Sequence, residues 1–336
     1  LPLLGVRSQA EARKVASYSN LYFVIKKIEI ICLTETQEDI DQILLKLKHR
    51  ATSLQDLSSL RFKLSKFQNS TGNTAKLIGE LLKKVPKVNE VELELYSMSL
   101  SEFQAIFDEL ITLNSLQNLS IDFEKCSSFS HEWFTYLQQS IPLLRSLNNL
   151  SLDFSNLKNR IKNQSLKCLG ECLKQTSLKS LSLSFMRCKK LDKEGLDALL
   201  NGISHLSLEE LNLNIYLHGH KLQATGMRGR ENLKVFKLKL QESDNKTKFQ
   251  QLTFNQYFMK LEQLNLNLGH LKLNLANLSQ LLNPEAFRIL KLEALLSSRA
   301  ATYSESELAQ FLRDLCKFKK MIVFELIGLR INENWI

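Results

Sequence analysis

The stretch LKSLSLSF, residues 178–185, decides the fold, and LEELNLNI, residues 208–215, repeats it one period later. Both stretches read L-x-x-L-x-L-x-(F/I), so apolar side chains occupy every second position over five residues. This alternation is typical of a short β-strand that buries one of its two faces. The side chains predicted to be buried, in adjacent parallel strands, are Leu181, Leu183, Leu211 and Leu213.

The same phrase recurs along most of the chain, which indicates a repeat protein. The clean copies begin at Leu116, Leu147, Leu178, Leu208 and Leu261, and variants begin at Ile25, Leu57, Val88, Leu233, Phe287 and Met321. These eleven copies are 25 to 34 residues apart. Segments with a helical period follow the strands, at residues 74–82, 101–110, 165–173, 194–203 and 305–315. One strand and one helix cannot bury their apolar faces alone, so we expect neighbouring repeats to stack into a continuous core.

In this pattern the chain resembles the leucine-rich-repeat family, specifically its long, helix-bearing subclass typified by ribonuclease inhibitor. The resemblance covers about residues 25–330 and implies an α/β solenoid of about eleven repeats, a horseshoe with a parallel inner sheet and outer helices. It also implies that Cys126 and Cys188, at the family's Asn/Cys position, lie in the interior. We expect residues 1–24 to form an N-terminal extension or cap and 25–330 a single array. Residues 331–336 form a C-terminal end that further chain or a partner covers.

Composition supports a packed, helix-containing fold. Of the 336 residues, 44% are hydrophobic, and 68 are Leu against 8 Val. Six Cys in a chain this long argue against a disulfide framework and favour an intracellular, cytoplasmic location. None of them forms a C-x-x-C pair, which argues against zinc ribbons and thioredoxin-type redox motifs. The basic N-terminal stretch, with Arg7, Arg13 and Lys14, leaves organelle import after processing as the alternative. The chain begins at Leu1 rather than at a methionine, which indicates a fragment or a processed form. The sequence contains no run of 18 apolar residues, so we expect no transmembrane helix.

The sequence contains no motif for catalysis or for a cofactor. The string nearest to a phosphate-binding loop, residues 71–76, lacks the required spacing and is interpreted as a helix start near Thr74. His218 and His220 have no Cys, Asp or Glu nearby to complete a metal site, so we interpret them as solvated. Cys168 and Cys172 lie one helical turn apart and are interpreted as core residues. We therefore predict a non-enzymatic protein without a metal or a cofactor.

Charge is unevenly divided between the predicted strands and the loops that follow them. The third, fifth and seventh positions of each copy should point away from the core, into the concave face, and there nine acids oppose six bases. This face also lacks the aromatic side chains on which single-stranded bases stack, which disfavours nucleic acid there. The candidate binding residues of the concave face are Glu92, Glu94, Asp122, Asp153, Ser182, Ser184, Asn212 and Asn214.

The loops after the strands carry much of the net charge of +10. Equivalent loops of a solenoid stack side by side, so these bases should form one basic rim, which either is ordinary solvated surface or binds an acidic protein or RNA. The residues of this predicted rim are Lys158, Arg160, Lys162, Arg187, Lys189, Lys190, Lys193, Lys221, Arg228, Arg230, Lys246 and Lys248.

Three functions remain open on these grounds. The first, which the family resemblance implies, is a scaffold that binds a protein partner on its curved repeat surface. The second is a component of a ribonucleoprotein or another large assembly that contacts RNA or an acidic protein through the basic rim. The third is the recognition part of a longer enzyme or signalling protein.

Overall fold

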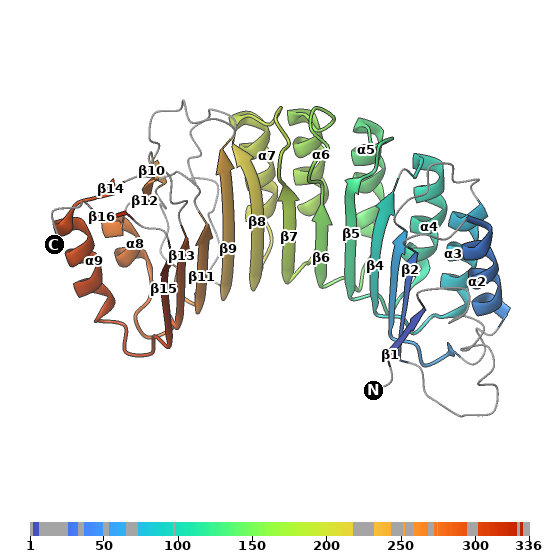
Figure 1. Cartoon of the computed structure of the whole chain (residues 1–336), viewed down its shortest axis with the longest axis horizontal. Coiled ribbons are helices and arrows are strands. Elements are labelled where there is room, and N and C mark those ends of the chain that lie inside the picture. Colours follow the sequence, from blue (N-terminus) through green and yellow to red (C-terminus); the bar gives the residue numbers. More distant parts are fainter. Residues whose placement is uncertain are drawn as a thin grey trace. The chain divides into compact units, whose positions relative to one another are not determined.

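The computed structural model divides into two compact units, each an open, all-parallel sheet with helices along one face (Figure 1). Unit 1 comprises Leu1–Arg160 with Gln175–Ser177, and unit 2 comprises Ile161–Lys174 with Leu178–Ile336. The structure describes residues 3–6, 26–32, 37–49, 54–64, 73–96, 98–217, 232–242, 251–252, 258–267, 272–273, 275–293, 302–327 and 330–331.

In unit 1, the described strands pair in parallel in the order of the sequence, and helices alternate with most of them. The strands are β1 (Leu3–Val6), β2 (Lys27–Cys32), β3 (Ser59–Leu64), β4 (Glu90–Tyr96), β5 (Asn118–Lys125) and β6 (Asn149–Asp153). The helices are α2 (Gln37–His49), α3 (Asn73–Lys84), α4 (Leu100–Thr112) and α5 (His131–Ser140), with a short 3₁₀ turn η2 (Ile141–Leu143).

Unit 2 repeats this arrangement. Its parallel ladder runs β7 (Ser180–Phe185), β8 (Glu210–Leu217), β9 (Val235–Glu242), β11 (Gln263–Asn267), β13 (Ile289–Glu293) and β15 (Val323–Ile327). Its helices are α6 (Asn163–Leu173), α7 (Lys193–Ser204), α8 (Leu275–Leu281) and α9 (Glu305–Leu315). Two short parallel pairs lie outside this ladder, β10 (Gln251–Leu252) with β12 (Lys272–Leu273) and β14 (Thr302–Tyr303) with β16 (Arg330–Ile331).

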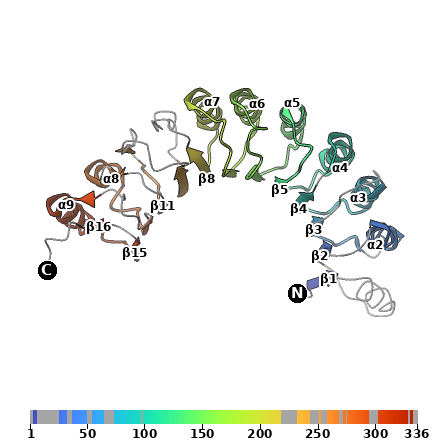
Figure 2. The same cartoon turned by 45° about the horizontal axis from the view of Figure 1, so that its top comes forward.

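These elements confirm the predicted α/β repeat fold. Each of the eleven predicted copies forms one strand of a parallel ladder, and that strand begins two residues after the first residue of the phrase. Helix α9 has the predicted bounds, and α3, α4, α6 and α7 extend the predicted segments by a few residues. In each unit, the helices lie on one face of the sheet (Figure 2). We call the opposite face of each sheet the open face.

A pair of hydrogen bonds recurs where the strands begin and fixes their register. The amides of Glu209 and Glu210 both donate to the carbonyl of Lys179, with N···O distances of 2.7 and 3.1 Å. In the next repeat, the amides of Lys234 and Val235 donate to the carbonyl of Glu209 at 2.8 and 3.0 Å. Equivalent pairs occur in unit 1. Within each unit, successive described repeats are therefore tied together by the same two bonds, and equivalent residues lie side by side.

The core lies between the sheet and the helices. The four leucines predicted to be buried are confirmed: Leu181 pairs with Leu211 and Leu183 with Leu213 across β7 and β8, and none of the four is accessible to solvent. In unit 1, aromatic rings fill the same layer. Phe123 of β5 stacks on Phe154 with ring centroids 5.1 Å apart, and its edge contacts Trp133 of α5. Such rings bury a large apolar area per side chain, which stabilises the stacked repeats.

Polar side chains define where the helices begin. Ser99 and Glu102 form a reciprocal capping box at α4, and Ser304 and Glu307 form another at α9. The side chain of Asp192 accepts hydrogen bonds from the amides of Glu194 and Gly195 at the start of α7. These caps satisfy amides that have no partner within the helix.

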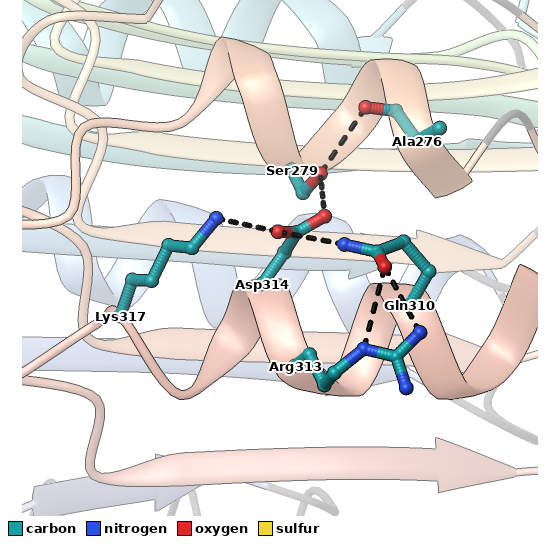
Figure 3. A network of polar contacts seen from close by, with 6 residues as sticks. All are labelled: Ala276, Ser279, Gln310, Arg313, Asp314 and Lys317. Atoms are coloured by element: carbon teal, nitrogen blue, oxygen red, sulfur yellow. Dashed lines mark hydrogen bonds and ion pairs between the residues drawn. The ribbon is translucent and has the colours of Figure 1, made fainter.

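A polar network joins α8 to α9 in unit 2 (Figure 3). The carboxylate of Asp314 accepts hydrogen bonds from Lys317 Nζ at 2.6 Å, from Gln310 Nε2 at 3.2 Å and from Ser279 Oγ at 3.3 Å. The bond from Lys317 is the main reason that the pKa of Asp314 lies below its usual value. The contact with Ser279 links helices from successive repeats.

Helices α6 and α7 approach closely because glycines lie between them. A Cβ atom on Gly170 would lie 2.6 Å from the carbonyl oxygen of Ala198, which is shorter than real contacts allow. A Cβ atom on Gly202 would overlap the backbone of Gly170 itself. The spacing of these two repeats therefore depends on the absence of side chains at both positions.

Strand β1 was not predicted from the sequence. Residues Leu3–Val6, in the stretch interpreted as an N-terminal extension or cap, form β1 and pair in parallel with β2. The stretch is short and does not contain the full repeat phrase, so the sequence pattern gives no signal for it.

Candidate interaction surfaces

The open face of each sheet displays rows of polar side chains that the strand register sets side by side. In unit 1, one row contains Lys63, Glu94, Asp122 and Asp153 on successive strands. These side chains are half-buried, and the apolar residues between them point into the core. The register thus builds a continuous polar surface from single residues that are about thirty positions apart in the chain.

Arg61 is the centre of an ion-pair network on the open face of unit 1. Its guanidinium lies 2.9 Å from a carboxylate oxygen of Glu29, 3.0 Å from Glu92 and 3.1 Å from Glu94. Lys63 adds a further pair with Glu94 at 2.7 Å. Partial burial lowers the screening of these charges, so the network holds the side chains of β2, β3 and β4 in fixed positions.

Asp122 and Asp153 lie beyond this network as register partners. The carboxylate of Asp122 accepts a hydrogen bond from the amide of Glu124 at 2.7 Å, and that of Asp153 accepts one from Ser155 at 2.8 Å. Burial, together with the negative charge of Asp153, raises the pKa of Asp122 to about 6, although the hydrogen bond from the amide of Glu124 lowers it. A nearby positive charge would stabilise the ionised form of these two carboxylates.

The excess of acids on the predicted concave face belongs to unit 1. At the third, fifth and seventh positions of its strands, six acids oppose three bases, whereas in unit 2 three acids oppose three bases. The acids of unit 1 are Glu29, Glu90, Glu92, Glu94, Asp122 and Asp153, and its bases are Lys27, Arg61 and Lys63. The acids of unit 2 are Glu210, Glu293 and Glu325, and its bases are Lys237, Lys239 and Lys291. The open face of unit 1 therefore carries an excess of negative charge at these positions, whereas that of unit 2 is balanced.

The open face of unit 2 is hollowed over β8, β9, β11, β13 and β15, with a volume of about 200 Å³. Amides and lysines line it: Asn212, Asn214, Asn265, Asn267, Lys237, Lys239 and Lys291. Asn212 donates a hydrogen bond to Ser182 at 3.1 Å. Asn265 and Asn267 were not predicted from the sequence as binding residues. The repeated string L-N-L-N, at 211–214 and 264–267, was the available signal.

Most of the predicted concave-face residues are half-exposed on the open faces, and one is not. Glu92, Glu94, Asp122 and Asp153 lie in unit 1, and Ser182, Asn212 and Asn214 lie in unit 2. Ser184 is 7% exposed, because the end of β7 is buried at three successive positions. It contributes little to a binding surface.

The predicted basic rim is only partly described by the structure. Lys221, Arg228, Arg230, Lys246 and Lys248 lie outside the described residues. Lys158 and Arg160 belong to unit 1, and the other described members belong to unit 2. Two bases are engaged elsewhere: Arg160 donates to the carbonyl of Cys126 at 3.1 Å, and Lys193 pairs with Asp197 at 2.9 Å.

In unit 2, the remaining bases of the rim lie near the starts of α6 and α7. The amide of Asp192 donates to Asn163 Oδ1 at 3.2 Å, so the two helix starts are adjacent. Lys162 directly precedes α6, and Arg187, Lys189 and Lys190 lie in the loop before α7. All four side chains are exposed, and Arg187 has a left-handed backbone with φ of 61°. The positive ends of two helix dipoles add to the charge of this loop.

Three of the described cysteines, Cys126, Cys172 and Cys188, are buried, whereas Cys316 is exposed. Cys126 and Cys188 are fully buried, as the resemblance implies, and the Cys126 thiol donates to the carbonyl of Met98 at 3.4 Å. Burial raises the pKa of the Cys172 thiol to about 12, which keeps it protonated and unreactive. Cys168, predicted to share its face and its burial, is only half-buried.

Neither a metal site nor a membrane-spanning helix is found in the described part of the chain. No three His, Cys, Asp or Glu side chains come together there as potential ligands, and His218 and His220 lie outside it. No described helix is both long and apolar enough to cross a bilayer. Comparison with known proteins gives no match: no family model fits the sequence, and no curated protein aligns with it.

Proposed function

We propose that this chain is a non-enzymatic leucine-rich-repeat protein of the ribonuclease-inhibitor-like subclass that binds a protein partner through its open faces. The observation that carries the proposal is the regular display of half-exposed polar side chains on a rigid parallel sheet, opposite the described helices. A preorganised surface of this kind binds without first ordering loops, which leaves more of the interaction energy for affinity.

Substitutions that add bulk to the open faces test the proposal; in unit 2 they also remove the hydrogen bond from Asn212 to Ser182. Ser120 and Ser151 are half-exposed register partners on the open face of unit 1, and Ser182 and Asn212 hold the same place in unit 2. The variants are Ser120→Arg with Ser151→Arg, and Ser182→Arg with Asn212→Arg. The matched control is Thr135→Arg with Gln139→Arg, at exposed positions of α5.

Affinity purification followed by mass spectrometry, with and without nuclease, gives the readout. The wild type and the α5 control should retain the same proteins after nuclease treatment, and at least one open-face variant should lose them. Retention by both open-face variants contradicts the proposal, and so does loss of all partners on nuclease treatment.

A second candidate function is supported by the exposed bases at the starts of α6 and α7. Lys162, Lys189 and Lys190 form no ion pair within the described residues, so they are available to a phosphate backbone or to an acidic protein. For single-stranded RNA, each contacted phosphate should add about −0.7 to the log–log slope of affinity against salt.

A salt titration of RNA binding separates this candidate from the first. The triple variant Arg187→Glu, Lys189→Glu, Lys190→Glu should weaken binding equally for all sequences, because phosphate contacts carry no sequence information. Lys237→Glu with Lys239→Glu, on the open face, should have a smaller effect. If the wild type has no affinity at about 50 mM salt, or the triple variant binds equally well, the basic loop does not bind RNA.

A further inference from the structure

The hollow on the open face of unit 2 contains a cation without an acidic partner. Lys239 of β9 lines the hollow, is exposed and forms no ion pair within the described residues. The other two lysines of the hollow are already neutralised: Lys237 pairs with Glu210 at 3.0 Å, and Lys291 pairs with Glu325 at 2.8 Å. The hollow therefore has one place that favours a negative group from outside.

The same hollow contains a buried acceptor without a donor. The Oδ1 atom of Asn265 is buried and has no hydrogen-bond partner among the described residues. In the register, Asn265 lies between Lys237 and Lys291, but both ammonium groups bind carboxylates instead. Leaving such a group unpaired costs free energy, and a turn of the Asn265 side chain toward a ligand N–H would remove that cost.

We propose that this hollow binds an acidic segment of a partner protein in an extended conformation. A side-chain carboxylate of the segment pairs with Lys239, and a backbone N–H of the segment donates to Asn265 Oδ1. A peptide that contains Asp or Glu supplies both groups within one residue. The proposal rests on protein binding by the open face and adds the chemical class of the partner and the place where it binds.

The chemistry of the hollow distinguishes this ligand from its competitors. A phosphate backbone carries no N–H for Asn265 Oδ1. The lining contains no aromatic ring on which a base could stack. A basic peptide would be repelled by Lys239.

A purified-protein assay tests the proposal on the full chain. The probe is a fluorescein-labelled octapeptide of alternating glutamate and glycine, and its binding is followed by fluorescence anisotropy at about 50 mM salt, where surface charge is weakly screened. Lys239→Gln should weaken binding about tenfold or more, since it removes a charge-assisted hydrogen bond. Lys76→Gln is the matched control: it removes the same charge from an exposed lysine of α3, outside both candidate surfaces, and should leave binding unchanged.

A second pair of changes tests the backbone hydrogen bond. Asn265→Leu should weaken binding several-fold while the protein remains as stable in a thermal melt, because the change removes an unsatisfied acceptor. The same octapeptide with N-methylated glutamates should lose affinity for the wild type and lose little more against Asn265→Leu. This non-additivity is the signature of a direct contact.

Four results would overturn the proposal: no binding by the wild type, equal weakening by Lys76→Gln and Lys239→Gln, additive effects of Asn265→Leu and N-methylation, or tighter Lys239-dependent binding of a labelled uridine octamer. The affinity purification with the open-face variants is interpreted separately from the octapeptide assay. If those variants lose their protein partners while the octapeptide does not bind, protein binding stands and only the acidic ligand is wrong. If the open-face variants retain all partners, the proposed function fails whatever the octapeptide does.

Discussion

Asp122 carries a charge that opposes folding. Its pKa is raised from an ordinary 3.8 to about 6, chiefly by burial and further by Asp153. Between pH values of about 4 and 6, the folded chain therefore binds this proton more tightly than the unfolded chain does, and stability increases as the pH falls through that window. Because the side chain is partly exposed, solvent screening leaves a penalty on the order of 1 kcal/mol at pH 7.

Asp122→Asn should remove this penalty. The amide keeps an oxygen that can accept the hydrogen bond from the amide of Glu124, so the free energy of unfolding at pH 7 should rise by on the order of 1 kcal/mol. The dependence of stability on pH between about 4 and 6 should become flatter. Urea unfolding at several pH values measures both effects, and the control is Glu132→Gln at an exposed position of α5. An unchanged slope would show that Asp122 is not the group responsible.

The buried side chain of Leu213 should contribute strongly to the free energy of unfolding. It is fully buried in β8 beside Leu183, and truncation to alanine should lower the free energy of unfolding by about 2–5 kcal/mol through lost apolar burial and the cavity left behind. Leu143 of η2 is 52% exposed, and Leu143→Ala should change stability by less than about 0.5 kcal/mol. Urea unfolding compares the two, and similar losses would contradict the burial.

At this scale, sequence reasoning located the residues but not their contacts. The alternation of the repeat placed Asp122, Asn212 and Lys239 on one face of their strands. It could not show that Ser184 is buried, because that depends on how the end of β7 packs. It also could not show that Lys237 turns to Glu210 and leaves Asn265 unpaired, since those bonds join residues of neighbouring strands.

Helices α6 and α7 form an element pair whose spacing a single methyl group should disturb. A Cβ atom on Gly202 would overlap the backbone of Gly170, and the backbone is harder to displace than a flexible side chain. Gly202→Ala should therefore lower the free energy of unfolding by about 1–3 kcal/mol, although alanine is the better helix former. Chemical denaturation gives the value. Asn201→Ala, at an exposed position of the same helix, should be close to neutral, and a Gly202→Ala protein as stable as the wild type would refute the close packing.

Elements were predicted well where the repeat pattern is complete. Helix α9 matches its predicted bounds because Ser304 caps it and the apolar positions keep a helical period to Leu315. Strand β1 and the short strands β10, β12, β14 and β16 were not predicted, because two to four residues are too few to show a period. Their pairing depends on what lies beside them rather than on local sequence.

At the scale of the whole molecule, the described strands differ in how well their neighbours protect them. Strand β8 pairs with β7 on one side and β9 on the other, whereas β15 pairs only with β13 in the described ladder. Near β15, Ile322 is 75% exposed and Ile327 is 53% exposed. Stability in a repeat array is roughly the sum of contacts between neighbours, so β15 should open more easily than β8.

Hydrogen exchange measured by mass spectrometry checks this expectation. Peptides that cover residues 321–327 should exchange faster than peptides that cover 210–217, in a sample shown to be monomeric. Equal protection of the two strands would indicate that further contacts cover β15.

The paired amide bonds at the strand starts also bear on how such a chain can change in length over evolution. Within each unit, a described repeat accepts the same two bonds from the next repeat that it donates to the previous one, so its two sides offer the same hydrogen-bonding groups. Duplicating or deleting a complete copy in the genome would leave the remaining junctions chemically intact, whereas an insertion of one residue inside a strand would turn its apolar side chains away from the core. Gain or loss of a complete repeat should therefore disturb the fold least. The open face would then become wider or narrower by the side chains of one strand at a time.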